Sequence, residues 1–148
     1  GCMITKTLII SAVQSAEIIA HAQREFPSEA CGLLYGVHDG AKACVDRIAA
    51  APNAETAAPQ RRFSIDPGFL LQAHKTARRT GEAIIGHYHS HPSGEAQPSL
   101  YDVSQIADPR AIWLICGITP GHAAALQAFM PDTDLCGFIA LDMTTITT

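Results

Sequence analysis

The chain has 148 residues, 47% of them hydrophobic and 16% charged, with a formal net charge of -4. This length predicts a single domain, residues 1–148, with a core of its own, and the composition excludes a disordered chain. No basic stripe stands out, which argues against a nucleic-acid partner. No apolar run approaches the roughly 18 residues of a membrane span.

The cysteines favour a reducing compartment. Their number is odd, and no two of them form a C-x-x-C pair. We expect the four that lie in or beside apolar stretches to be reduced, buried residues of a cytoplasmic protein. A thiolate-metal site is the alternative. The five residues are Cys2, Cys31, Cys44, Cys116 and Cys136.

The first part of the chain predicts a strand, a helix and a β-hairpin. Ser11 is a suitable N-cap for a helix that Pro27 ends, and Val13 belongs to its expected core-facing stripe. His21, on the same helix, is expected at the surface or half-buried. Residues 38–40 are a hairpin turn signal. The strands are predicted at 7–10, 30–35 and 41–48.

A polar loop and a second helix follow. Residues 49–61 are rich in Ala, Pro and polar side chains without periodicity, which predicts a mobile loop. We interpret its Arg61-Arg62 pair as a solvated surface, although the pair could also steer an acidic partner. Asp66-Pro67 is an N-cap and first-turn pair for a helix that runs to Thr80, before Gly81.

The second half of the chain predicts more strands and one short helix. A buried strand begins near Ala83 and ends at Pro92, because proline cannot donate to a sheet ladder. Ser99 is the expected N-cap of a short helix whose apolar side includes Leu100. Six to seven strands with three helices fit an α/β or α+β fold with a mixed sheet. The last strands are predicted at 111–118, 123–130 and 135–141, followed by a frayed Thr-rich end.

The stretch from His87 to Asp102 carries the candidate chemistry. His89 and His91 are two apart on a strand, so their side chains share a face, with Cα atoms about 6.6 Å apart. Asp102, one turn inside the next helix, can fold back beside them. Two imidazoles, one carboxylate and a vacant fourth position make a catalytic zinc site. A His-x-His pair alone is more often a pair of ordinary polar strand residues.

Three separate parts of the chain together resemble the JAMM (also MPN+ or JAB) metalloprotease family. They are the segment 89–91, the pair Ser99 and Asp102 that follows it, and the upstream segment 27–36, which bears Glu29. The resemblance implies a cytidine-deaminase-like architecture with a curved, partly barrel-like mixed sheet flanked by about three helices. It also implies that the metal lies at the edge of the sheet, where we expect an extended peptide to bind as an added strand.

The resemblance implies a role for each of these residues. One zinc ion per chain is expected on His89, His91 and Asp102. Glu29 is expected to be the acid/base and not a ligand, although a glutamate at a helix-strand junction is usually a solvated surface residue. Ser99 is expected to cap its helix and to donate a hydrogen bond to the developing oxyanion.

His87 lies on the same face of the strand as the histidine pair and is therefore a rival ligand. We interpret it as a supporting or packing residue, because the family's histidine pair matches His89 and His91. Glu95 and His122 have no assignable role.

Three classes of function remain open. The first is a zinc peptidase or isopeptidase, similar to small bacterial family members that cleave immediately after the C-terminal Gly-Gly of ubiquitin-like β-grasp sulfur carriers. The second is a non-catalytic scaffold on the same fold, although such relatives lack the metal ligands that this chain retains. The third is a RadC-like protein with a DNA-linked role. Residues 91–94, 98–99 and 102 also resemble the motif of such proteins.

The segment 29–32 and the acidic net charge favour the peptidase. Salt-dependent binding to duplex DNA is expected only of the RadC-like protein. The oligomeric state stays open, with a homodimer as one alternative.

Overall fold

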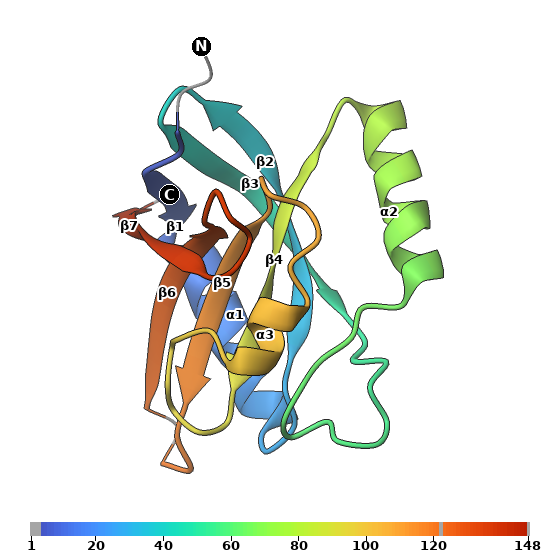
Figure 1. The fold of residues 1–148 in the computed structure, drawn as a ribbon, viewed down its shortest axis with the longest axis vertical. Coiled ribbons are helices and arrows are strands. Elements are labelled where there is room, and N and C mark those ends of the chain that lie inside the picture. Colours follow the sequence, from blue (N-terminus) through green and yellow to red (C-terminus); the bar gives the residue numbers. More distant parts are fainter. Residues whose placement is uncertain (1–3, 122, 148) are drawn as a thin grey trace.

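The computed structural model describes residues 4–121 and 123–147. In this part of the chain seven strands form one closed barrel in the order β1-β3-β2-β4-β5-β6-β7, with three helices around it (Figure 1). The strands are β1 (Thr7–Ser11), β2 (Cys31–Asp39), β3 (Lys42–Ala51), β4 (Ile84–His91), β5 (Ile112–Ile118), β6 (Ala124–Pro131) and β7 (Phe138–Ile146). The helices are α1 (Ala12–Glu25), α2 (Pro67–Thr80) and α3 (Leu100–Ser104).

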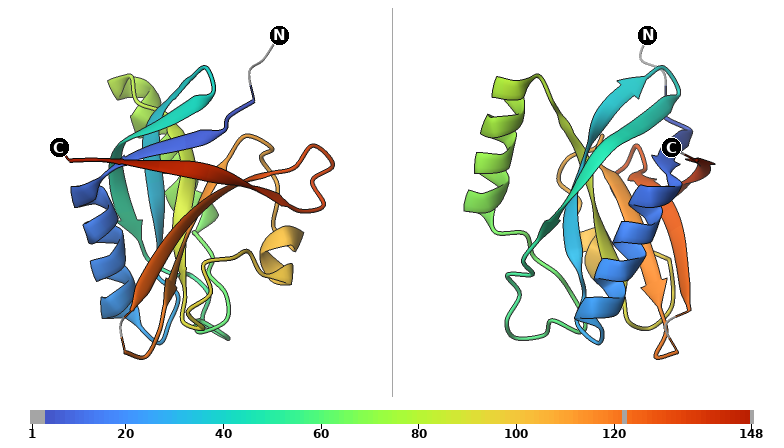
Figure 2. Two further views of the ribbon diagram at one scale, coloured as in Figure 1. Left: turned by 90° about the vertical axis from the view of Figure 1, so that its left-hand side faces the viewer. Right: turned by 180° about the vertical axis from the view of Figure 1, so that it is seen from behind.

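The helices cover different sides of the barrel. Figure 2 shows α1 crossing the side opposite α3, while α2 stands beside β2 and β4. The main core joins α1 to all seven strands and contains Tyr88 of β4. A second cluster lies under α2, and a third joins β5 and β6 to Phe63, Ile106, Ala111 and Phe138. Because side chains alternate along a strand, the histidines next to Tyr88 face away from the main core.

Local signals set the ends of the helices, as predicted. The Ser11 hydroxyl accepts a hydrogen bond from the Gln14 amide, and the Gln14 side chain accepts one from the Ser11 amide, which completes a capping box. Asp66 caps α2 through the Phe69 amide, and Gly81 ends it with a φ of 76°. Both predicted helices are therefore confirmed.

The closure of the sheet corrects the sequence-based architecture. The mixed α+β class with three helices is confirmed, but β1 pairs in parallel with both β3 and β7, so the sheet closes into a barrel. The Thr-rich end, expected to fray, is part of β7, where Thr144 and Thr145 pair with β1. Since β4 has β2 and β5 as neighbours, the expected position of the site at a sheet edge is wrong.

The buried face of α1 also differs from the prediction. Val13, expected in the core, is 58% exposed, whereas Ile18, His21 and Ala22 are buried. His21 was expected at the surface or half-buried. Its burial is possible because Nδ1 lies 2.8 Å from the hydroxyl oxygen of Tyr88, which gives the ring a polar partner inside the protein.

The four cysteines that the structure describes are free thiols. Cys31 and Cys116 are buried and Cys44 is half-buried, but Cys136 is exposed, so its predicted burial is wrong. Cys136 lies in the turn before β7, which begins later than predicted. Cys2 and His122 lie outside the described residues. Within the described residues, no helix has the length and apolarity to cross a membrane.

Candidate metal centre

The chain that leads into β2 and the start of α3 both lie against the carboxyl end of β4. Cys31 of β2 lies opposite His89 in the antiparallel pair, so the chain that leads into β2 runs beside the end of β4. The Ala30 amide donates to the Ser90 hydroxyl at 2.8 Å, and the Ser90 amide donates to the Ala30 carbonyl at 3.0 Å. These two reciprocal bonds hold Glu29 beside the histidines.

The three predicted metal ligands converge on one point. His89 Nε2 lies 3.1 Å from His91 Nε2, and Asp102 Oδ2 lies 3.4 Å from the first nitrogen and 3.2 Å from the second. Tetrahedral zinc, with bonds of about 2.0–2.1 Å, separates its ligand atoms by about 3.3 Å. All three side chains are buried. The donor set and its spacing therefore fit a zinc ion.

The hydrogen bonding of His91 prepares its free nitrogen for a metal. Nδ1 lies 3.0 Å from the carbonyl oxygen of Glu95, which can only accept, so Nδ1 carries a proton, and Nε2 can present a lone pair to a metal once its own proton is released. Burial lowers the pKa of His89 and keeps that ring neutral despite Asp102. Burial also acts to lower the pKa of His91, but the hydrogen bond and charge of Asp102, together with Glu29 and the Glu95 carbonyl, outweigh it and the pKa is raised.

Asp102 is held by the start of α3. Its amide donates to the Ser99 hydroxyl at 3.0 Å, and the Ser99 amide donates back to Asp102 Oδ2 at 2.9 Å. Burial acts to raise the pKa of Asp102, but the hydrogen bonds from His89 and His91 outweigh it and hold the pKa below its usual value. The N-cap prediction is confirmed, whereas Leu100, expected on the buried side of α3, is 92% exposed.

Glu29 is a buried residue with one carboxyl oxygen that has no hydrogen-bond partner among the described residues. It is 4% exposed, and its Oε1 atom is buried and unpaired among the described residues. Burial raises the pKa of Glu29 to about 7, opposed by His91 and assisted by Asp102. A carboxyl group with this pKa can exchange a proton at neutral pH. An unpaired buried polar atom is costly, which marks this position as a candidate functional residue.

A rival ligand set replaces Asp102 with Glu29. One carboxylate oxygen of Glu29 and one nitrogen each of His89 and His91 lie within 4.8 Å of one another. The Asp102 oxygen approaches both nitrogens more closely, at 3.4 and 3.2 Å, which favours Asp102 as the third ligand. Glu29 is then near enough to act on a group bound between them.

His87, the rival histidine, faces an aromatic cluster instead of the donor atoms. Its ring centroid lies 4.4 Å from that of Trp113 and 5.2 Å from that of Phe63. Burial, with a smaller effect of His89, lowers the pKa of His87 to about 3. Phe63 also stacks on His89, with ring centroids 4.3 Å apart and planes 19° apart. Sequence reasoning missed Phe63, since a single aromatic in a polar loop gives no signal.

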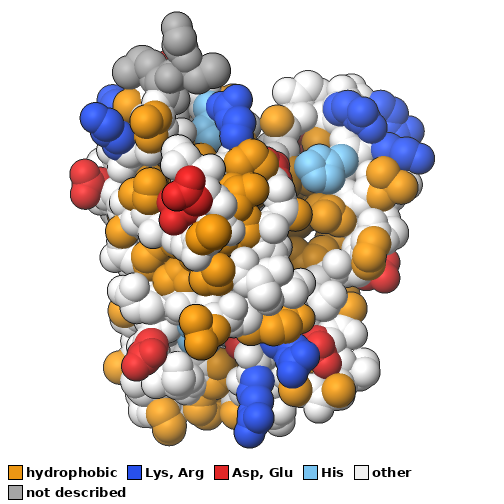
Figure 3. Space-filling view, in the orientation of Figure 1, with side chains coloured by type: hydrophobic (Ala, Val, Ile, Leu, Met, Phe, Trp, Pro, Cys, Tyr) orange, Lys and Arg blue, Asp and Glu red, His pale blue; other side chains and the backbone are white. Residues whose placement is uncertain are grey.

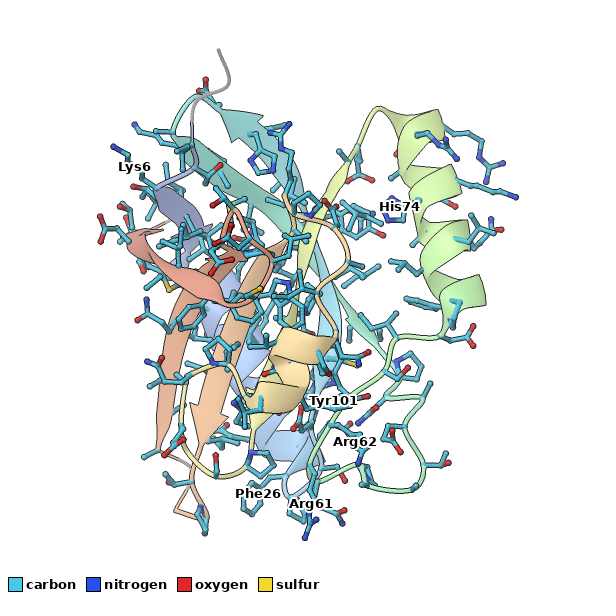
Figure 4. The ribbon with its side chains drawn as sticks, viewed as in Figure 1. Lys6, Phe26, Arg61, Arg62, His74 and Tyr101 are labelled. Carbon is cyan, nitrogen blue, oxygen red and sulfur yellow. The ribbon has the colours of Figure 1, made fainter. Side chains whose placement is uncertain are left out.

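The loop between β3 and α2 is tied across the site. The Asn53 side-chain amide donates to the carbonyl groups of Glu29 and Arg62, each at 3.2 Å, and its oxygen accepts from the Ser64 amide at 3.0 Å. The Arg62 guanidinium lies 4.8 Å above the ring of Tyr101 in α3 (Figure 4). The loop predicted as mobile thus has defined contacts with the site.

A cleft of about 170 Å³ opens beside the donor atoms. Its lining comes from the Glu29 segment, the loop before α2, and the chain from the end of β4 to Ser99. These residues are Glu29, Gln60, Arg61, His91, Pro92, Ser93, Glu95, Gln97, Pro98 and Ser99. A larger hollow of about 260 Å³ lies between α2 and the barrel, with mainly hydrophobic walls (Figure 3). His87 lines this hollow, whereas His89, His91 and Asp102 do not.

The α+β barrel brings the end of a strand, a short helix and a buried glutamate together at one cleft. Residues 11–130 match the family described as prokaryotic homologs of the JAB domain. The chain therefore belongs to the JAB family of JAMM/MPN-type peptidases, as its motifs predicted.

The curated relatives include a peptidase and a probable protease. The chain is 30% identical over 122 residues to the CysO-cysteine peptidase of Mycobacterium tuberculosis, covering 82% of this chain and 81% of the relative. It is 37% identical over 89 residues to the "Probable TtuB-protein conjugate cleaving protease" of Thermus thermophilus, covering 60% and 56%. The desampylase of Haloferax volcanii is 29% identical over 119 residues, covering 77% and 83%.

Solved structures show the same fold. A protein from Desulfitobacterium hafniense has a TM-score of 0.82 at 32% identity, with 95% of this chain and 94% of that chain covered. A protein from Salinibacter ruber has a TM-score of 0.71 at 27% identity, with 96% and 92% covered.

Proposed function

We propose that the protein is a zinc-dependent peptidase that hydrolyses the bond after the C-terminal Gly-Gly of a ubiquitin-like sulfur-carrier protein. The observation that carries the proposal is the convergence of His89, His91 and Asp102 at 3.1–3.4 Å beside the unpaired, buried Glu29. The names of the relatives, which concern CysO, TtuB conjugates and desampylation, support this class of substrate.

In this proposal His89, His91 and Asp102 hold the zinc ion. When bound, zinc lowers the pKa of a water to about 7 and polarises a carbonyl group. Glu29 accepts a proton in the cleft and delivers it to the leaving nitrogen, a task for which a pKa of about 7 is suited. The Ser99 oxygen accepts from the Asp102 amide, so its own proton is free to be donated to the developing oxyanion.

The form of the cleft favours a substrate tail with small residues. A cleft of about 170 Å³ between two loops has little room for side chains next to the reacting bond, and glycines leave the backbone free to enter it. Because β4 is paired on both sides, the tail would lie across the end of β4 instead of extending the sheet. The free thiols accord with a cytoplasmic protein.

The decisive experiment uses candidate β-grasp carriers extended by one or a few residues beyond Gly-Gly. Zinc-loaded protein should remove the extension and leave a carrier that ends in Gly-Gly, as measured by mass spectrometry. Chelator-treated protein and the Glu29→Gln variant are the controls and should leave the extension in place. Intact carriers, together with trimmed ubiquitin chains or unrelated peptides, would show that the substrate assignment is wrong.

A further inference from the structure

One arginine, Arg61, lines the cleft. Arg61 is exposed and lines the same cleft as Glu29, His91 and Ser99. Among the described residues, no carboxylate lies within the 4.0 Å of an ion pair with it. Its amide donates to the Ala58 carbonyl at 3.0 Å, which fixes the backbone of the turn.

The neighbouring arginine holds the loop in place. Arg62 lies over the Tyr101 ring at 4.8 Å, and its carbonyl accepts from the Asn53 side chain at 3.2 Å. Figure 4 shows Arg61 and Arg62 on the same stretch of loop, next to the α3 helix that bears Tyr101. The loop is thus anchored at Arg62, while the Arg61 side chain remains available to a ligand in the cleft.

The remaining charges of the cleft are carboxylates. Glu29 is buried beside the candidate ligands, and Glu95 is exposed in the loop after β4. Apart from His91, Arg61 is therefore the only cationic side chain among the residues that line the cleft. A guanidinium presents a planar set of donors that matches a carboxylate with two parallel hydrogen bonds.

We propose that Arg61 binds the α-carboxylate of the residue that is released from the carrier. This inference rests on the proposed function and assigns its substrate class. Hydrolysis adds water across the scissile amide, so the glycine gains a carboxylate and the released residue gains an amine. In a Gly-Gly-X tail, the α-carboxylate of X is separated from the scissile nitrogen by a single carbon atom, which keeps it beside the reacting bond.

An isopeptide-linked substrate lacks this group. There the scissile nitrogen ends a lysine side chain, and the lysine carbonyl group belongs to a neutral main-chain amide several bonds away. Arg61 therefore selects linear carriers that end in one extra residue over carriers conjugated to a protein. Glu95, in the same cleft, disfavours a second negative charge on the released residue.

The test compares two carriers that end in Gly-Gly-Ala, one as the free acid and one as the C-terminal carboxamide. The zinc-loaded wild type should cleave the acid with a kcat/KM about tenfold higher, mainly through KM, because a charge-assisted hydrogen bond to the carboxylate is lost in the amide. Arg61→Ala should cleave both at the lower rate, and Arg61→Lys should restore part of the preference. Arg79→Ala, which removes an exposed α2 cation, should keep the wild-type preference.

Binding of the same two carriers to zinc-loaded Glu29→Gln separates recognition from turnover. Tighter binding of the acid that Arg61→Ala abolishes supports the carboxylate site, even if no carrier is cleaved and the proposed function fails. The inference is overturned if the wild type does not distinguish acid from amide in either assay. It is also overturned if Arg61→Ala keeps the distinction.

Discussion

Ser99 and Asp102 cap each other: the Asp102 amide donates to the Ser99 hydroxyl at 3.0 Å, and the Ser99 amide donates to Asp102 Oδ2 at 2.9 Å. The carboxylate oxygen that completes the helix cap is also the oxygen that faces His89 and His91. One local sequence signal, a serine three residues before an aspartate, thus orients a candidate metal ligand and leaves the serine hydroxyl at the cleft.

Replacing Ser99 should affect both stability and rate. Ser99→Ala removes the cap, which lowers the free energy of unfolding by about 1 kcal/mol. It also removes the hydroxyl donor at the cleft, which should lower kcat by about a hundredfold. Urea unfolding and steady-state kinetics measure the two effects. Ser99→Thr, which keeps both functions of the hydroxyl, is the control, and an unchanged kcat in Ser99→Ala would exclude Ser99 from the reaction.

The histidine pair should determine the metal content. We expect one zinc ion per chain in the wild type and less than a tenth of this in the His89→Ala/His91→Ala double variant, by elemental analysis after gel filtration. His87→Ala should keep most of its zinc, because its ring packs against Trp113 and Phe63 and lies outside the donor triangle. Equal zinc in the double variant and the wild type would refute the ligand assignment.

Glu29→Gln should keep the metal and lose turnover. The amide has the size of the carboxyl group but cannot accept the proton, so kcat should fall by about a hundredfold to ten-thousandfold. The zinc content, measured on the same sample, should equal that of the wild type, since His89, His91 and Asp102 are retained. Full activity in this variant would assign proton transfer to another residue, whereas loss of zinc would favour Glu29 as a ligand.

The metal-free protein should lose stability as Glu29 ionises. Burial raises the pKa of Glu29 from 4.5 to about 7, so the native state retains a proton that the unfolded chain releases. The stabilisation is complete below pH 4.5 and is lost as the pH rises to about 7. The difference in free energy of unfolding between Glu29→Gln and the wild type should therefore change by about 3 kcal/mol over this interval, in favour of the variant. Urea unfolding in chelator measures it, and parallel pH curves would contradict the prediction.

The parts of the fold that depend on neighbouring residues could be predicted from the sequence. The N-caps Ser11, Asp66 and Ser99 each act on an amide three residues away, so the pattern that forms the cap is visible in the chain itself. The pair His89 and His91 was visible for the same reason, because a strand places alternate residues on one face. The position of Glu29 came from the family resemblance and not from local pattern.

The parts that depend on distant residues could not be predicted. Pairing of Thr144 and Thr145 with the first strand closes the barrel, and no local feature of a Thr-rich end indicates such a partner. The burial of His21 depends on the hydroxyl of Tyr88, which is 67 residues away. Likewise, the stacking of Phe63 on His89 joins the loop before α2 to β4, and the composition of that loop indicated only a polar surface.

The reciprocal bonds between Ala30 and Ser90 have a consequence for how this chain tolerates insertions and deletions. They lock β2 against β4 in one register, in which Cys31 faces His89. A single residue added or removed between Glu29 and Cys31 would reverse which side chains face the cleft, so the carboxyl group would turn away although the barrel still formed. Length changes in the turn before β7, which carries no site residue, leave this alignment intact. Natural and designed variation in length should therefore accumulate there and be absent from the entrance to β2.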